Sequence, residues 1–164
     1  MTKSRTPALD ALDRRLLALW QNDTRRSAES LGEAVGLSAA AVLRRLKRLR
    51  DERVIAAEVA LLDPAALGAG QSCVVTVDVE REGLVELERF ERRMLALPQV
   101  QQCWYVTGQS DFVLVVVTPD VAAYEAFTRE HLLSDANVKS FTTHVVLKSV
   151  KRSLEIPIEL PEVD

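Results

Sequence analysis

The sequence predicts an α+β protein in which a small helical domain is followed by a domain of alternating strands and helices. Two short amphipathic helices, joined by a glycine turn, fall between residues 27 and 53. The second half of the chain follows the order strand, helix, strand, strand, helix, strand. The two parts also differ in charge, because residues 1–60 carry a net +4 and residues 61–164 a net −7.

Composition indicates a folded protein of one domain or two small ones. The chain has 164 residues, of which 48% are hydrophobic. No apolar run approaches the ~20 residues that cross a bilayer, and the polar start of the chain lacks the apolar core of a signal peptide. We therefore expect a cytoplasmic protein with no membrane partner, whose two cysteines are reduced.

The first helix is predicted over residues 10–20 and the second from residue 28. Leucines and a tryptophan share one face of the first helix, at Leu12, Leu16, Leu19 and Trp20. Ser27 caps the second helix, whose apolar stripe consists of Ala28, Leu31, Ala34 and Val35. These stripes predict a small shared helical core.

A tight turn and a third helix follow at once. Gly36 permits a left-handed backbone, and Ser38 is a good N-cap. The predicted inner face consists of Ala39, Val42, Leu43, Leu46 and Leu49. The predicted outer face consists of Ala40, Ala41, Arg44 and Arg48, with Arg45 and Lys47 on the flanks.

Small residues followed by cations are typical of a helix that enters the major groove of DNA. Small side chains permit close approach, and cations meet phosphates and guanine edges. The two helices and their turn are thus predicted to be a helix-turn-helix unit whose second helix reads bases. A solvated basic surface is the alternative, and the basic charge of this part of the chain favours DNA.

The next segment is predicted to lead out of the first domain. Residues 54–62 are extended and apolar, which suggests a wing strand. The pair Asp63-Pro64, with Gly68 and Gly70, indicates a connector.

The second half predicts strands at 72–80, 100–107, 112–118 and 138–150. Helices are predicted from Leu84 to Pro98 and from Pro119 onward, which completes the ferredoxin-like order. The strand at 112–118 is apolar on both faces, so a second subunit is expected to cover the face that the helices leave open. A twofold dimer would present two reading helices to a pseudo-palindromic site in double-stranded DNA.

Motifs along nearly the whole chain resemble those of one family. They are L-D-A-L-D-R-R-L-L (9–17), the D-x-R-x-S spacing (23–27), V-G-L-S (35–38), L-R-R-L-K-R-L (43–49), V-I-A (54–56), L-D-P-A-A-L-G (62–68), V-T-G-Q-S-D-F (106–112) and T-T-H-V-V-L-K-S-V-K (142–151). Through these motifs the sequence resembles the Lrp/AsnC, or feast/famine, transcriptional regulators.

The resemblance implies a winged helix-turn-helix at 1–60, a linker at 61–70, a ferredoxin-like ligand-sensing and oligomerisation domain at 71–155 and a tail at 156–164. It also implies dimers that can assemble into octamers, and a small amino-acid effector. The expected DNA-binding residues are Arg25, Ser38, Ala39, Ala40, Ala41, Arg44, Arg45, Lys47 and Arg48. The expected effector-binding residues are Tyr105, Thr107, Gly108, Gln109, Ser110, Asp111 and Thr143.

Two departures from the family pattern leave questions open. Ala57 and Glu58 stand where the wing often carries an aromatic residue, and the turn at 108–110 does not name an effector. The turn also has a plain structural interpretation, in which Asp111 caps the following strand.

Other functions are weaker predictions. His131 and His144 show no metal-ligand spacing, and no nucleophile or phosphate-binding motif occurs, so no cofactor, metal or catalytic residue is expected. An enzyme resembling the sirohaem decarboxylases, and a scaffold that binds ligand without DNA, are the alternatives to a regulator.

Overall fold

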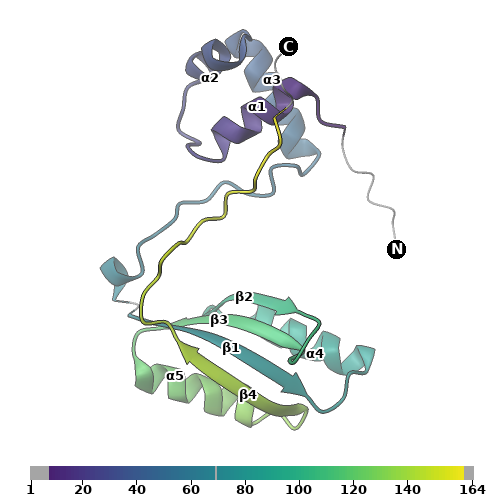
Figure 1. Ribbon diagram of the computed structural model, residues 1–164, viewed down its shortest axis with the longest axis vertical. Helices are drawn as coiled ribbons and strands as arrows, with labels where there is room; N and C mark the ends of the chain where they lie inside the picture. Colours follow the sequence, from purple (N-terminus) through teal and green to yellow (C-terminus); the bar gives the residue numbers. More distant parts are fainter. Residues whose placement is uncertain (1–7, 69, 161–164) are drawn as a thin grey trace. The chain divides into compact units, whose positions relative to one another are not determined.

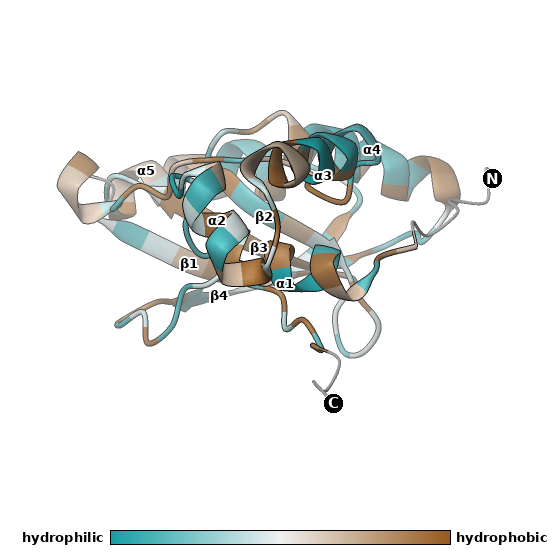
Figure 2. Ribbon diagram, turned by 90° about the horizontal axis from the view of Figure 1, so that it is seen from above, coloured by the Kyte–Doolittle hydropathy of each residue, from teal (hydrophilic) through white to brown (hydrophobic). Residues whose placement is uncertain are grey.

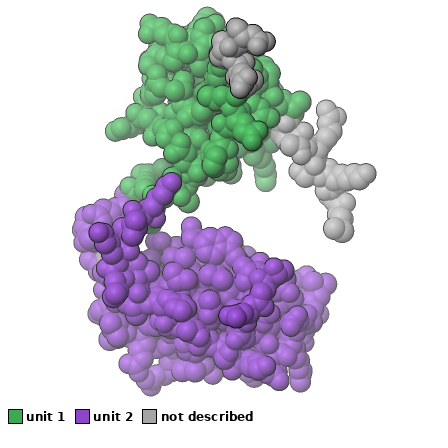
Figure 3. All heavy atoms as spheres, in the orientation of Figure 1, with its two compact units in different colours: residues 1–61, 152–164 green, residues 62–151 purple. Residues whose placement is uncertain are grey.

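The computed structural model describes residues 8–68 and 70–160 of the chain. It divides into two compact units (Figures 1 and 3). Unit 1 comprises the chain up to Leu61 and the segment that begins at Arg152, and unit 2 is Leu62–Lys151. The predicted α+β class is confirmed. Residues 1–7 of the predicted first domain and residues 161–164 of the predicted tail lie outside the described residues.

Unit 1 contains the three predicted helices, α1 (Ala11–Trp20), α2 (Ala28–Val35) and α3 (Ala39–Asp51). Each helix begins at a side-chain cap. Asp10 and Asp13 form a capping box on α1, and Ser27 and Ser38 cap α2 and α3. Apolar side chains from all three helices form one buried cluster, consisting of Leu16, Trp20, Leu31, Val42 and Leu46.

The predicted wing strand is not present, because residues 54–62 form neither a strand nor a helix. Side chains hold this segment instead. The indole Nε1 of Trp20 donates to Glu58 Oε1 at 2.6 Å, and Arg50 Nη2 lies 2.8 Å from the same oxygen. A strand needs a hydrogen-bonded partner strand, and no described segment of unit 1 offers one.

The segment that begins at Arg152 belongs to unit 1, whereas the sequence suggested a sensor domain reaching residue 155 and a separate tail. The side-chain amide of Gln21 exchanges two hydrogen bonds with the backbone of Ile156, each 3.0 Å long. The chain therefore passes between the two units twice, once at Leu61 and once at Arg152.

Unit 2 has the predicted ferredoxin-like order. A short 3₁₀ turn, Ala65–Leu67, precedes the sheet. The elements are β1 (Gln71–Val79), α4 (Leu84–Leu95), β2 (Val100–Tyr105), β3 (Phe112–Thr118), α5 (Val121–Thr128), a π-helical turn η2 (Arg129–Leu133) and β4 (Val138–Val145). The strands lie in the order β2-β3-β1-β4 with antiparallel pairing throughout, and β4 ends five residues earlier than the predicted residue 150.

Both helices of unit 2 pack on one face of the sheet, which holds its core (Figure 1). Alternate residues of β1 and β3 point to these helices, and they are Cys73, Val75, Val77, Phe112, Leu114 and Val116. Phe90 of α4 packs against Phe112 with the two rings tilted by 38° and their centroids 4.5 Å apart. The strand alternation thus places one complete row of each central strand in the core.

The opposite face of the sheet is also apolar at its centre. Val113, Val115 and Val117 of β3 occupy it, and each of them is half-buried. Figure 2 colours the helices and strands by hydropathy. Trp104 of β2 is 46% exposed beside Val113, whereas β4 contributes polar residues such as Thr142. No described helix of unit 2 covers this face, which we call the open face.

Candidate nucleic-acid interface and ligand turn

The connection between α2 and α3 is a close-packed helix-turn-helix turn. Gly36 ends α2 in the left-handed conformation, with φ 73°. Leu37 then donates its backbone N–H to the carbonyl of Gly32 at 2.9 Å. A Cβ on Gly32 would lie 2.4 Å from the carbonyl oxygen of Leu37, so the turn packs directly on the α2 backbone at this point.

The orientation of α3 differs from the predicted one by part of a turn. Val42, Leu46 and Leu49 are buried as expected, but Leu43 is 57% exposed instead of lying in the core. The side chains that point away from the core are small, apolar and cationic, and we call them the reading face: Ala40, Leu43, Arg44 and Lys47.

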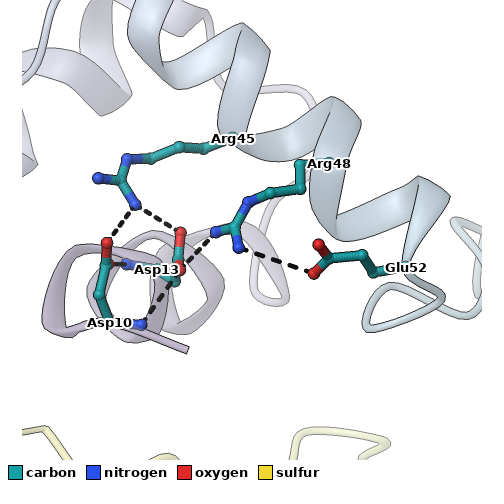
Figure 4. A network of polar contacts seen from close by, with 5 residues as sticks. All are labelled: Asp10, Asp13, Arg45, Arg48 and Glu52. Carbon is teal, nitrogen blue, oxygen red and sulfur yellow. Dashed lines mark hydrogen bonds and ion pairs between the residues drawn. The ribbon is translucent and has the colours of Figure 1, made fainter. Parts of the chain in front are cut away.

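Arg45 and Arg48 do not belong to the reading face, and the prediction that Arg48 points outward is wrong. Arg45 Nη1 lies 2.8 Å from Asp13 Oδ1 and 2.7 Å from Asp10 Oδ2. Arg48 Nη2 lies 2.5 Å from Asp13 Oδ2 (Figure 4). Both guanidiniums therefore point to the start of α1, because a buried carboxylate there attracts them.

The electrostatics of this network favour its charged form. Burial alone would raise the pKa of Asp13, but the hydrogen bonds from Arg48 and Arg45 outweigh burial and hold the pKa below its usual value. The hydrogen bonds to Asp10 and Asp13 raise the pKa of Arg45. The network is thus a charged cluster between α1 and α3 rather than a neutral hydrogen-bonded pair.

The other predicted DNA-binding residues lie at or near the turn. Ser38 accepts the backbone N–H of Ala41 at 3.3 Å, so it serves as the N-cap of α3. Ala39 and Ala41 are half-buried. Arg25 is exposed before α2 and pairs with Asp23 at 3.0 Å, which raises the pKa of the guanidinium. Only a part of the predicted set therefore shares one surface with Arg44.

Sequence reasoning missed three residues that shape this interface, namely Asp13, Gly32 and Leu43. In the sequence, Asp13 is an aspartate three residues after a helix cap, and such residues are common at the surface. Its distinguishing feature is its pairing with two arginines that lie 32 and 35 positions later in the chain. On a helical wheel with about 100° per residue, Leu43 lies at the edge of the apolar stripe of α3, so the wheel places it in the core. Burial, which decides between the two edges of a stripe, depends on the position of the neighbouring helices.

The predicted effector turn joins β2 to β3. Gly108 has φ 136°, and open space surrounds the position where a Cβ would be. Asp111 accepts the backbone N–H of Val79 through Oδ2 at 2.7 Å, and its own N–H donates to Val77 at 3.0 Å. Asp111 thus anchors the turn to β1, whereas the structural interpretation of this residue predicted that it caps the following strand, β3.

The structure brings most of the predicted effector residues together but separates one of them. Thr107, Gln109 and Ser110 lie in the turn itself, and Tyr105 precedes it with its ring 5.2 Å from that of Phe112. Thr143 lies in β4, which β1 separates from β3, and its hydroxyl is 2.5 Å from that of Tyr124. Thr143 therefore belongs to the packing of α5 on the sheet rather than to the turn.

A helix-turn-helix unit with a basic outer helix, followed by a ferredoxin-like domain, defines the class of two-domain DNA-binding regulators. Comparison with known families agrees with this class. The AsnC-type helix-turn-helix domain matches residues 9–50, and the Lrp/AsnC ligand binding domain matches residues 72–156. The chain belongs to the Lrp/AsnC family of transcriptional regulators.

Relatives cover nearly the whole chain. The Bkd operon transcriptional regulator of Pseudomonas aeruginosa is 38% identical over 87% of this chain and 93% of its own length. The leucine-responsive regulatory protein of Escherichia coli is 34% identical over 92% of both chains. A transcriptional regulator from Neisseria meningitidis, solved as an L-Met complex, has a TM-score of 0.85 at 31% identity over 92% of this chain and 97% of its own.

The protein is therefore a DNA-binding transcriptional regulator with a ligand-binding domain, and the predicted family is confirmed. Its relatives are regulators rather than enzymes, which confirms the non-enzymatic prediction over the sirohaem decarboxylase alternative. None of the described helices combines the length and hydropathy of a bilayer span.

Proposed function

We propose that this regulator reads double-stranded DNA in the cytoplasm with the reading face of α3, and that it does so as a twofold dimer modulated by a small amino acid. The exposure of Ala40, Leu43, Arg44 and Lys47 on one side of α3 is the observation that carries the proposal. Among the described residues, Arg44 has no ion-pair partner, and Lys47 pairs only with the exposed Asp51. Such exposed pairs are weak, so both cations are available to phosphate.

The other two side chains suit the floor of a major groove. Ala40 is small enough for close approach of the helix to the bases. Leu43 offers an apolar group at the surface, and apolar side chains contact the methyl group of thymine. The face thus combines groups that bind the DNA backbone with groups that distinguish bases.

We expect Arg44→Ala and Lys47→Ala to weaken binding to the upstream region of the protein's own gene without unfolding unit 1. Each lost phosphate contact should reduce the slope of log K against log salt by about 0.9. Fluorescence anisotropy with a labelled duplex between low and moderate salt measures this slope. Glu33→Ala, an exposed change on α2, is the control, and slopes equal to wild type in both variants would contradict the proposed face.

The dimer is proposed because the open face of unit 2 is apolar at its centre. An uncovered apolar face is costly in water, and the same face of a second subunit covers it with twofold symmetry. Two reading helices related by such an axis fit a site with two similar half-sites. The dimer is the unit of our proposal, and octamers remain a prediction from the family resemblance.

The amino-acid effector is proposed for the turn between β2 and β3. Support comes from the ligand binding domain that matches unit 2 and from the relative solved with L-Met. Gly108 leaves room for a ligand carboxylate near backbone N–H groups, and Asp111 retains Oδ1 for an ammonium group while Oδ2 accepts from Val79.

We expect amino acids, L-Met among them, to raise the thermal midpoint of the protein, because a ligand at 100 times its Kd stabilises the folded state by about 2.7 kcal/mol. In Asp111→Asn the amide oxygen still accepts from Val79, but the charge for the ammonium is lost, so affinity should fall about tenfold or more. Calorimetric titration of each variant with the amino acid measures this affinity. Asp120→Asn, which changes another carboxylate that accepts a backbone N–H, is the control, and wild-type affinity in Asp111→Asn would refute the assignment.

A further inference from the structure

Asp13 is a charged side chain inside unit 1, with only 1% of its surface exposed. Its two oxygens accept three hydrogen bonds, from Arg45 Nη1 at 2.8 Å, from Arg48 Nη2 at 2.5 Å and from the backbone N–H of Asp10 at 3.2 Å. Figure 4 shows both guanidiniums reaching from α3 to this one carboxylate. The network therefore links the start of α1 to the middle of α3.

The geometry of this link is directional in a way that the apolar core is not. Leu16 of α1 and Leu46 of α3 share the buried cluster, but apolar contacts are non-directional and tolerate small rotations of a helix. Charge-assisted hydrogen bonds have preferred distances and angles. Because Arg45 and Arg48 are three residues apart on one flank of α3, their bonds to Asp13 resist rotation of α3 about its own axis.

We propose that Asp13 is a positioning residue for DNA recognition. It holds Arg45 and Arg48 so that the reading face of α3 points outward, and the two arginines act through α1 rather than on phosphate. The inference rests on the proposed reading face, and it assigns to Arg45 and Arg48 a role different from that of Arg44.

The substitution Asp13→Asn separates positioning from simple electrostatics. It removes a negative charge next to the reading helix, so attraction to DNA alone would make every duplex bind more tightly. Positioning gives the opposite result for the specific site. We expect the affinity for the upstream duplex to fall about tenfold, which is the effect of losing one good contact to a base. The affinity for a scrambled duplex should stay equal or rise.

The matched pair Arg48→Ala and Arg44→Ala tests the role of the arginines. Both substitutions remove one guanidinium from the same helix, four residues apart. Arg44→Ala should reduce the salt slope by about 0.9 and weaken both duplexes alike. Arg48→Ala should leave the salt slope unchanged and lower the ratio of specific to non-specific affinity about tenfold.

Two results would overturn the inference. One is an Arg48→Ala slope that falls as in Arg44→Ala, with equal loss on both duplexes, because Arg48 would then contact phosphate. The other is tighter binding of Asp13→Asn to both duplexes. An Arg44→Ala slope equal to that of wild type would instead contradict the proposed reading face, so the two failures are distinguishable.

Folding of each variant is checked by circular dichroism at the assay temperature. If Asp13→Asn does not fold, Arg48→Ala decides the question, since the Arg48 side chain is already 38% exposed and its loss leaves Arg45 on the carboxylate. The same salt series and the same pair of duplexes then give the outcome.

Discussion

The substitution Val115→Lys is expected to give a monomer of 18.2 kDa in place of the proposed dimer and to abolish tight binding to a site with two half-sites. Val115 lies in the middle of the open face, between Val74 of β1 and Gln102 of β2. A lysine there would place a charge inside the proposed apolar interface, where it has no partner. Because the second reading helix adds an intramolecular contact, its loss should lower affinity about 10²–10⁴-fold.

Light scattering after gel filtration measures the mass, and anisotropy with full and half sites measures the affinity. Val121→Lys is the control, since Val121 is an exposed valine at the start of α5, on the side of the sheet that carries the helices. It should change neither quantity. A dimeric Val115→Lys protein with unchanged affinity would show that the open face is not the interface that DNA binding requires.

The substitution Gly32→Ala is expected to destabilise unit 1 by about 1–3 kcal/mol, as overpacking does, and to weaken DNA binding. Its Cβ would lie 2.4 Å from the backbone oxygen of Leu37, and a backbone atom cannot rotate away as a side chain can. The turn must therefore shift, and with it Ser38 and the start of α3. Urea unfolding in a Trp104→Phe background, which leaves Trp20 as the fluorescent tryptophan, reports on this unit.

Gly36→Ala distinguishes crowding from backbone strain. Its Cβ would meet no atom within 4 Å, but φ is 73°, so the expected cost is the ~1–2 kcal/mol of a left-handed non-glycine residue. Glu33→Ala, next to Gly32 on the exposed side of α2, should stay within about 0.5 kcal/mol of wild type. A Gly32→Ala protein as stable as the Glu33→Ala control would contradict the tight packing of the turn.

Local patterns predicted the elements of the fold well. The serine caps at Ser27 and Ser38, the glycine at Gly36 and the strand alternation around Val75 each act within a few residues, and the structure has the predicted helices and strands at these places. The wing strand failed for a different reason. Its residues favour extended backbone, but a strand also needs a partner, and Glu58 instead anchors the segment to Trp20 and Arg50.

The sequence predicted the position of α3 in the chain more accurately than it predicted which side chains of α3 are available to DNA. A helical wheel places Arg44, Arg45 and Arg48 on or near the polar side of α3, and it treats them as equivalent cations. In the structure, only Arg44 stays free of ion pairs with the described residues, because Asp13 binds the other two from a helix more than 30 residues earlier. No spacing rule within α3 contains that information.

Short-range chemistry in the sequence is thus sufficient for the order of elements, for the helix-turn-helix and for the family, since caps, periodicity and motifs depend on near neighbours. Long-range packing decided which residues face outward. It buried Asp13, exposed Leu43, drew Arg45 and Arg48 to α1 and separated Thr143 from the ligand turn. The physical reason is that a buried charge must find its partners wherever the fold brings them, and only the folded chain shows where they meet.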